Sequence, residues 1–375
     1  MLTTEELKRY NRHIILSDIG KEGQEKLKKA RVLVVGAGGL GCPVLSYLTA
    51  AGIGTIAIAD FDRIDESNLQ RQVLYTSDDV GKYKAVTAAE KLSRQNPFVT
   101  FDVFSERLTS DNILAIFADY DIIVDGSDNF PTRYLVNDAC VQLDKVLVFG
   151  SIFRFEGQVS VFNYKHNGQR GPTYRCLFPE PPAPGEVPNC SQIGVLGVLP
   201  GVIGSFQANE VLKIVLGLGD VLSGKVLIAD LLAMSFHVIQ FKANAENFHI
   251  KGFVDYDQFC AGDAQKHEAP DSGALSPEQL RELLDTKEDI ELLDVREDFE
   301  REICHIGGIH IPMRMIAQHV HQLPKEKKLI VYCHYGMRSA SVIQFLSSQG
   351  FTRLYNLEGG IDAWAEEIDP EMERY

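Results

Sequence analysis

Short apolar runs alternate with longer segments of helical periodicity through the first third of the chain. Most of the runs lack an alternating polar face, which is typical of strands buried on both sides of a sheet. Strands are predicted at 31–35, 55–60, 99–104 and 121–125, and the helices between them at 40–51, 80–95 and 113–117. This alternation predicts an α/β fold with a Rossmann-like, doubly wound sheet.

A change of composition divides the chain after further strands at 146–149 and 156–162 and a helix at about 202–216. From 244 to 273 the residues turn polar, and Ser276 then opens a capping box with Gln279 that marks a new helix. Strands at 290–295 and 329–333 with helices around them predict a second, smaller α/β domain. The predicted organisation is a first domain at 1–245, a linker at 246–274 and a second domain at 275–375.

The net charge limits the classes of partner that the chain can bind, and the cysteines indicate its cellular compartment. A formal net charge of -15 argues against nucleic acid as the main partner, because phosphate binding needs a basic surface. The most apolar stretch, 193–208, is short and interrupted by Pro200 and glycines, so no membrane span is expected. Seven scattered cysteines and a polar N-terminal segment unlike a signal peptide favour a cytoplasmic protein.

A glycine-rich turn lies between the first predicted strand and its helix. Gly36, Gly38 and Gly41 match G-x-G-x-x-G, which lets the backbone approach phosphates at a helix N-terminus. Asp60 ends the next strand, where a carboxylate accepts hydrogen bonds from ribose hydroxyls. The motif fits an NAD-dependent oxidoreductase as well as an ATP-binding enzyme, and a tight turn without any ligand also remains open.

A polar cluster further along the chain favours a triphosphate. Splitting ATP requires fixed cations and a carboxylate for Mg²⁺, whereas a dinucleotide needs little beyond the helix terminus. Arg71 and Lys84 supply the cations and Asp128 supplies the carboxylate. All three are expected at strand ends, where sheets of this class bind ligands.

These motifs resemble the MoeB/ThiF family, the bacterial relatives of ubiquitin-activating enzymes. The resemblance covers about 1–245 and rests on 9–12, 36–41, 60–62, 67–72, Lys84 and 125–129. It implies that ATP adenylates the C-terminal glycine of a ubiquitin-like sulfur carrier of the MoaD or ThiS type, ending in Gly-Gly. It implies magnesium at Asp128, and nucleotide contacts at Gly36, Gly38, Gly39, Gly41, Asp60, Asn68, Arg71 and Lys84. It also implies a homodimer in which Arg12 reaches the ATP site of the partner subunit.

The resemblance to the MoeB/ThiF family also bears on two cysteines, Cys190 and Cys176. Cys190 resembles the cysteine with which some members form a thioester or mixed disulfide with the carrier, although an idle loop thiol remains the alternative. Many members hold a structural zinc through two C-x-x-C pairs. Here Thr173 replaces the first ligand before Cys176, and 244–252 contains no cysteine. A single thiolate does not make a tetrahedral sulfur site, so no structural zinc is predicted.

A second reactive loop, 333–338, lies between a predicted strand and a helix. Backbone N–H groups, the helix dipole and Arg338 favour the thiolate form of Cys333 there. With 292–297, 305–308 and 357–364, the loop resembles a single rhodanese domain. That resemblance implies that Cys333 carries a transferable sulfur and that Arg338 helps bind the donor, such as thiosulfate or a cysteine desulfurase.

Together these features predict an enzyme that adenylates the carrier and then delivers sulfur from a Cys333 persulfide, directly or through Cys190, to form a thiocarboxylate. Such carriers serve molybdopterin or thiamine biosynthesis, and the sequence does not distinguish the two. Three alternatives remain open at this point. They are an activator of a modified tRNA base, an NAD-dependent oxidoreductase, and a scaffold that binds the carrier without turnover.

Overall fold

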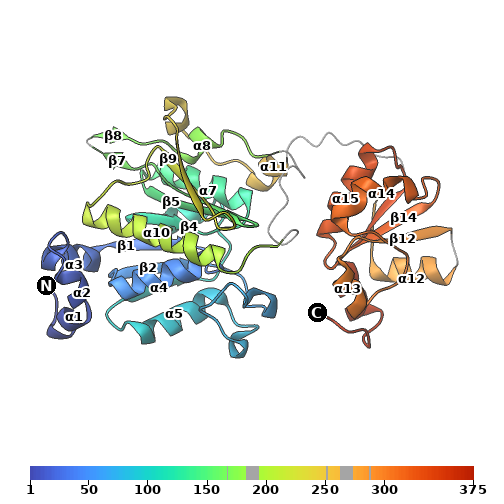
Figure 1. Ribbon diagram of the computed structural model, residues 1–375, viewed down its shortest axis with the longest axis horizontal. Coiled ribbons are helices and arrows are strands. Elements are labelled where there is room, and N and C mark those ends of the chain that lie inside the picture. Colours follow the sequence, from blue (N-terminus) through green and yellow to red (C-terminus); the bar gives the residue numbers. More distant parts are fainter. Residues whose placement is uncertain (167, 183–193, 251, 262–272, 287–288) are drawn as a thin grey trace. The chain divides into compact units, whose positions relative to one another are not determined.

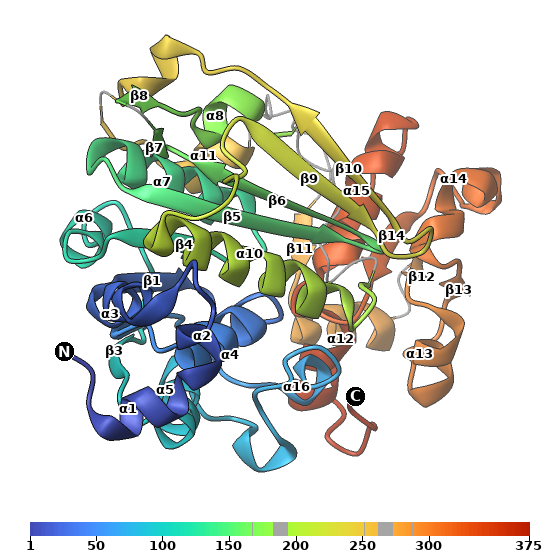
Figure 2. The same cartoon turned by 60° about the vertical axis from the view of Figure 1, so that its left-hand side comes forward.

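The computed structural model describes residues 1–166, 168–182, 194–250, 252–261, 273–286 and 289–375 (Figures 1 and 2). The chain divides into two compact units, Met1–Asp263 and Ala264–Tyr375. Among the described residues, no helix is both long and apolar enough to cross a bilayer.

The first unit is built on an eight-stranded sheet with the order β10-β9-β6-β5-β4-β1-β2-β3. Five strands are parallel, namely β1 (Arg31–Val35), β2 (Thr55–Ala59), β3 (Thr100–Phe104), β4 (Ile122–Asp125) and β5 (Val146–Phe153). Three more are added antiparallel, namely β6 (Glu156–Phe162), β9 (Lys225–Asp230) and β10 (Ser235–Gln240). The Rossmann-like sheet is therefore confirmed, and it is mixed because hairpins extend it beyond β5.

Helices cover both faces of this sheet (Figures 1 and 2). One face packs against α3 (Gly20–Lys29), α4 (Gly41–Ala51), α5 (Lys84–Gln95) and α10 (Leu199–Leu216). The other packs against α6 (Ile113–Phe117), α7 (Phe130–Gln142), α8 (Tyr174–Leu177) and α11 (Tyr256–Ala261). The remaining elements are α1 (Thr4–Arg9), α2 (Asn11–Ile14), η1 (Glu66–Asn68), η2 (Ser77–Asp79), β7 (Lys165–His166), β8 (Gln169–Arg170) and η3 (Ala245–Phe248).

Part of the expected linker, 246–274, is ordered structure. Within it, α11 packs against α7, and the Tyr256 hydroxyl donates a 2.7 Å hydrogen bond to the buried carboxylate of Asp138. Arg175 forks onto the same carboxylate at 2.7 and 2.8 Å. The first unit thus continues beyond residue 245, because this polar-looking segment buries an aromatic side chain on it.

The second unit has a five-stranded sheet with the order β11-β15-β14-β12-β13, and all its pairs are parallel. Its strands are β11 (Gly273–Leu275), β12 (Ile290–Asp294), β13 (Ile309–His310), β14 (Lys328–Tyr332) and β15 (Leu354–Leu357). Its helices are α12 (Pro277–Asp285), α13 (Asp298–Ile303), η4 (Met313–Met315), α14 (Ile316–His319), η5 (Val320–Gln322), α15 (Met337–Ser348) and α16 (Gly360–Glu367). The smaller α/β unit is as predicted.

Candidate active sites

A cavity of about 240 Å³ opens in the first unit where β1, β2 and β4 end. Parallel sheets of this class bind ligands at the carboxyl ends of their strands. Most of the predicted nucleotide contacts line it, namely Gly36, Gly38, Gly39, Asp60, Arg71, Lys84 and Asp128. Gly41, Asn68 and Arg12 are not among the lining residues.

The glycine turn is shaped by close backbone approach. Gly36 has a φ of +88°, and a Cβ on Gly41 would lie 2.0 Å from the Gly36 carbonyl oxygen. Asp60 fastens the turn, because its Oδ2 accepts a 2.7 Å hydrogen bond from the Ala37 N–H. Burial raises the pKa of Asp60, with Lys84 as the main opposing influence. Gly41 therefore serves the site by allowing the turn rather than by lining the cavity.

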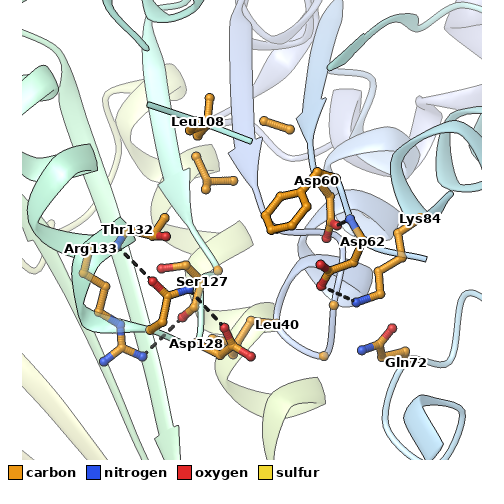
Figure 3. Close-up of a pocket in the computed structure, with 18 of the residues that line it drawn as sticks. Leu40, Asp60, Asp62, Gln72, Lys84, Leu108, Ser127, Asp128, Thr132 and Arg133 are labelled. Atoms are coloured by element: carbon orange, nitrogen blue, oxygen red, sulfur yellow. Dashed lines mark hydrogen bonds and ion pairs between the residues drawn. The ribbon is translucent and has the colours of Figure 1, made fainter. Parts of the chain in front are cut away.

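Two basic side chains, Lys84 and Arg71, are among those that line the cavity, and Figure 3 shows Lys84 beside Asp62. Lys84 is the first residue of α5, and its nearly buried ammonium is 2.9 Å from Oδ2 of Asp62. Arg71 donates a 3.1 Å hydrogen bond to the carbonyl of Ser67. The sequence pattern predicted a helix from residue 80, but α5 begins at Lys84 because Tyr83 is extended. With that start, the Lys84 side chain is among those that line the cavity.

Asp128 and Arg133 lie across the cavity from Lys84 (Figure 3). The exposed carboxylate of Asp128 accepts a 3.3 Å hydrogen bond from the Asn129 amide. The Arg133 guanidinium donates a 3.2 Å hydrogen bond to the Ser127 carbonyl and lies 5.6 Å from the ring centre of Phe149. Sequence reasoning missed Arg133 because it overlooked α7, the helix that carries this residue.

Two side chains that line the cavity have a buried polar atom without a hydrogen-bond partner, namely Oγ of Ser127 and Oε1 of Gln72. Asp125, which precedes the lining residue Gly126, is buried and is not itself a lining residue. Burial raises the pKa of Asp125, and Arg133 opposes this increase. Unpaired buried acceptors are costly unless a ligand or ordered water supplies the missing donor, so these atoms fit a polar ligand such as a nucleotide.

The side chains at the cavity include a carboxylate that could bind a magnesium ion, Asp128. No group of three or more His, Cys, Asp or Glu that could cage a metal ion occurs in the part of the chain that the structure describes. Mg²⁺ often needs only one or two protein carboxylates, with substrate phosphates and water as the other ligands. The exposed carboxylate of Asp128 fits that kind of site.

The position at which many family members hold a structural zinc has a hydrogen-bonded thiol in this chain. Cys176 accepts N–H hydrogen bonds from Asn244 at 3.3 Å and Thr173 at 3.4 Å, and a longer one from the Asn247 amide at 3.7 Å. Although burial alone would raise it, these hydrogen bonds lower the pKa of Cys176 below the ordinary thiol value. Only one of these four side chains carries sulfur, so the donor set does not fit a tetrahedral sulfur site.

The second candidate site is the loop after β14. Cys333 is buried, and its Sγ accepts hydrogen bonds from the Gly336 N–H at 3.1 Å and the Ser339 hydroxyl at 3.4 Å. The first turn of α16 holds the loop, because the Ile361 N–H donates to the Cys333 carbonyl at 2.9 Å. A Cβ on Gly360 would lie 2.5 Å from that carbonyl oxygen. The thiol is thus fixed in a cradle of donors.

Arg338 belongs to the first turn of α15 and is held by Glu300. Its two terminal nitrogens each lie 2.6 Å from a Glu300 carboxylate oxygen. Burial would raise the pKa of Glu300, but the bonds from Arg338 and the Glu297 N–H hold that pKa below its usual value. Sequence reasoning assigned Arg338 to donor binding and did not identify Glu300, whose helix α13 was not predicted.

Cys190, the predicted partner of the carrier, lies outside the described residues. Cys304 lies after α13, the helix that carries Glu300; it is half-buried, and its sulfur lies 3.9 Å from Nη1 of Arg296. Arg296 itself is fully buried in a 2.7 Å ion pair with Asp294.

Two family models match the chain. The one described as ThiF family matches residues 10–249, and the one described as Rhodanese-like domain matches residues 276–367. In solved structures, E. coli MccB is similar with a TM-score of 0.56 and 22% identity, covering 65% of this chain and 71% of that one. At this identity the likeness supports the fold alone.

Curated proteins match over the whole chain. The probable adenylyltransferase/sulfurtransferase MoeZ of Mycobacterium tuberculosis is 44% identical, covering 100% of this chain and 96% of that protein. The adenylyltransferase and sulfurtransferase MOCS3 of Culex quinquefasciatus is 40% identical, covering 100% and 90%. The sulfur carrier protein adenylyltransferase of Thermus thermophilus is 52% identical, covering 69% of this chain and 98% of that protein.

Proposed function

The chain belongs to the ThiF family and is an adenylyltransferase with a rhodanese-like sulfurtransferase unit, and from this premise we propose its substrate and reaction sequence. It adenylates the C-terminal glycine of a ubiquitin-like sulfur carrier ending in Gly-Gly and converts that carboxylate into a thiocarboxylate. The name of the Thermus relative supports the substrate class. The oxidoreductase alternative is set aside because the relatives are adenylyltransferases.

Adenylation calls for charge compensation rather than a protein nucleophile. A carboxylate oxygen bonds to the α-phosphorus, the bond from that phosphorus to the bridging oxygen breaks, and pyrophosphate leaves. Lys84 and Arg71 line the cavity with the positive charge that offsets the incoming carboxylate and the leaving group. Asp128 would hold Mg²⁺ together with phosphate oxygens, and the bound ion would stabilise the charge of the leaving group.

Sulfur transfer needs two thiols. A persulfide on Cys333 attacks the carrier's acyl carbon, AMP leaves, and an acyl disulfide links the carrier to Cys333. A second thiolate then attacks the Cys333 sulfur and releases the thiocarboxylate, leaving a protein disulfide that an external thiol reduces. We assign the second thiolate to Cys190. The sulfur donor is thiosulfate or the persulfide of a cysteine desulfurase.

A homodimer completes the proposed adenylation site. Arg12 is exposed on α2 and does not line the cavity of its own chain, which suits a residue donated to a partner subunit. Ile15 and Leu16 follow it and are 61% and 52% exposed, which suits burial in an interface. We also place the protein in the cytoplasm, where the six free cysteines among the described residues would stay reduced.

The single observation that carries the proposal is the presence of both sites in one chain: a cavity with Lys84, Arg71 and Asp128, and a cradled thiol at Cys333. The test is ATP–pyrophosphate exchange in the presence of purified carriers ending in Gly-Gly, beside thiosulfate sulfurtransfer. Exchange should depend on one carrier. Cys333→Ala should abolish sulfurtransfer and leave exchange intact, whereas absence of exchange with every such carrier would refute the adenylation step.

A further inference from the structure

The ring of Tyr375 lies beside the reactive loop of the second unit. Its centre is 4.4 Å from that of His334, the residue after Cys333, and the two rings meet edge to face at 85°. His334 is buried, and this burial lowers its pKa. One flank of the loop is therefore covered by a residue 42 positions after the reactive cysteine.

The Tyr375 hydroxyl joins two ion pairs. It accepts a 2.9 Å hydrogen bond from Nη1 of Arg296, which is fully buried against Asp294, and it donates one of 3.1 Å to Oε1 of Glu300. Glu300 is the carboxylate that grips both terminal nitrogens of Arg338. A continuous chain of hydrogen bonds therefore runs from the rigid core of the unit through one hydroxyl to Arg338.

Neighbouring residues fix the segment that carries Tyr375. Arg374 forks onto Asp362 with two hydrogen bonds of 3.0 Å, and Asp362 donates its backbone N–H to the His334 carbonyl. Met372 packs on the cluster that contains Trp364. Two anchors, at Met372 and Arg374, therefore hold the segment beside Tyr375, so its position does not depend on a single side chain.

Arg338 lies in the chain between Gly336 and Ser339, the two residues that hydrogen-bond the Cys333 sulfur. Burial would lower the pKa of Arg338, but the hydrogen bonds and charge of Glu300, with a smaller contribution from Cys333, raise it. A guanidinium whose two terminal nitrogens are held by one carboxylate has one orientation, whereas a freely rotating guanidinium spreads its charge over many. A group that holds Glu300 in place therefore also determines where the positive charge of Arg338 lies relative to the Cys333 thiol.

We propose that Tyr375 is a positioning residue for sulfur transfer, whose hydroxyl fixes Glu300 and thereby holds Arg338 in one orientation beside the Cys333 loop. The rhodanese-like match ends at residue 367, so this contribution comes from outside the matched domain. The inference rests on the proposed role of Cys333 and adds a determinant of how an anionic sulfur donor is received. An oriented guanidinium attracts such a donor to the thiol, and a disordered one does so less well.

The test uses the full-length protein and two alkylating reagents of similar size. Iodoacetate is an anion and iodoacetamide is neutral, so the ratio of their rates at Cys333, followed by peptide mass spectrometry, reports the local positive charge. Tyr375→Phe keeps the ring and removes the hydroxyl. In this variant the rate with iodoacetate divided by the rate with iodoacetamide should fall about fivefold, which is the change in rate that the loss of one hydrogen bond corresponds to. KM for thiosulfate should rise by a similar factor, with kcat nearly unchanged.

A double-mutant cycle shows whether Tyr375 acts through Arg338. In an Arg338→Gln background, Tyr375→Phe should lower the ratio no further, because the charge that it positions is gone. Tyr332→Phe is the matched control, since it removes a hydroxyl bonded at 2.9 Å to the Gly307 carbonyl in the same unit. It should lower thermal stability without changing the ratio.

Two results would overturn the proposal. One is an unchanged ratio in Tyr375→Phe, and the other is an undiminished effect of that change when Arg338 is already Gln. The alkylation ratio needs no sulfur donor, so it stays informative even if the wild-type protein does not use thiosulfate. Absence of sulfurtransfer in the wild type would instead count against the proposed function.

Discussion

At the scale of single residues, the two partners of the Lys84 ion pair differ in their exposure to water. The Lys84 side chain is 8% exposed, whereas that of Asp62 is 53% exposed. If the ion pair breaks, water can solvate the Asp62 carboxylate. An unpaired Lys84 would instead remain a nearly buried charge, which costs much free energy. We therefore expect a phosphate that enters the cavity to replace Asp62 as the partner of Lys84.

Replacing Lys84 should stop adenylation without unfolding the protein. Lys84→Met is expected to lower carrier-dependent ATP–pyrophosphate exchange by about a hundredfold, because one preorganised cation facing the phosphates is lost. Lys82→Met is the matched control, since Lys82 is two residues away, largely exposed and paired with Asp79. It should stay within about twofold of wild type, and equal losses in both variants would contradict the assignment.

Residue types alone predicted Asp60, Lys84 and Asp128 as neighbours, because strand ends of a parallel sheet meet at one edge. They did not predict Glu300 or Arg133. From the sequence alone, Glu300 is most simply interpreted as a solvated surface charge, because its partner, Arg338, is 38 residues away in the chain. Contacts of that kind follow from tertiary packing, which no local pattern encodes.

At the scale of elements, the difficult cases are buried helices and segments with polar composition. In α7, eight consecutive residues from Tyr134 to Val141 are buried, so the helix shows no polar stripe at a 3.6-residue period. In α5 the pattern was right and only the start was wrong. The composition of the segment around α11 predicts a linker, because its polar residues outnumber the few aromatic residues that anchor it.

Cys176 should hold η3 against α8. Cys176→Ser is expected to lower the free energy of unfolding by about 1 kcal/mol and to speed amide exchange at 244–248 relative to the rest of the unit. The pKa of Cys176 is lowered in the folded state, so its stabilisation is present above the ordinary thiol pKa and lost as pH falls through the folded value. The difference from wild type should thus grow between about pH 6 and pH 9, and a difference that shrinks over this range would contradict the account.

At the scale of the whole molecule, two kinds of chemistry are assigned to two units with separate sheets and separate cores. The family resemblance of each unit could be read from its motifs, because glycine turns and a cysteine loop keep their spacing. The limits between the units could not, since composition does not reveal whether a polar segment packs.

Chelation should separate the two activities. EDTA is expected to abolish ATP–pyrophosphate exchange, with recovery on adding Mg²⁺, while thiosulfate sulfurtransfer and the melting temperature stay unchanged. The reason is that Asp128 would bind Mg²⁺ only together with the nucleotide, and no caged metal site occurs within the described ranges. A drop of several degrees on chelation, or stoichiometric zinc in the purified protein, would reveal a structural metal instead.

The pairing of β11 with β15 bears on how the sulfur-transfer unit can be isolated. Gly273 to Leu275 lie upstream of the matched range that starts at residue 276, yet they form one of the two edge strands of the sheet. A fragment that begins at residue 276 would lack this strand, and the backbone N–H and C=O groups of β15 would be exposed at the edge of the sheet. Exposed edges of this kind pair with other chains, so we expect such a fragment to aggregate. Expression fragments should therefore begin before Gly273.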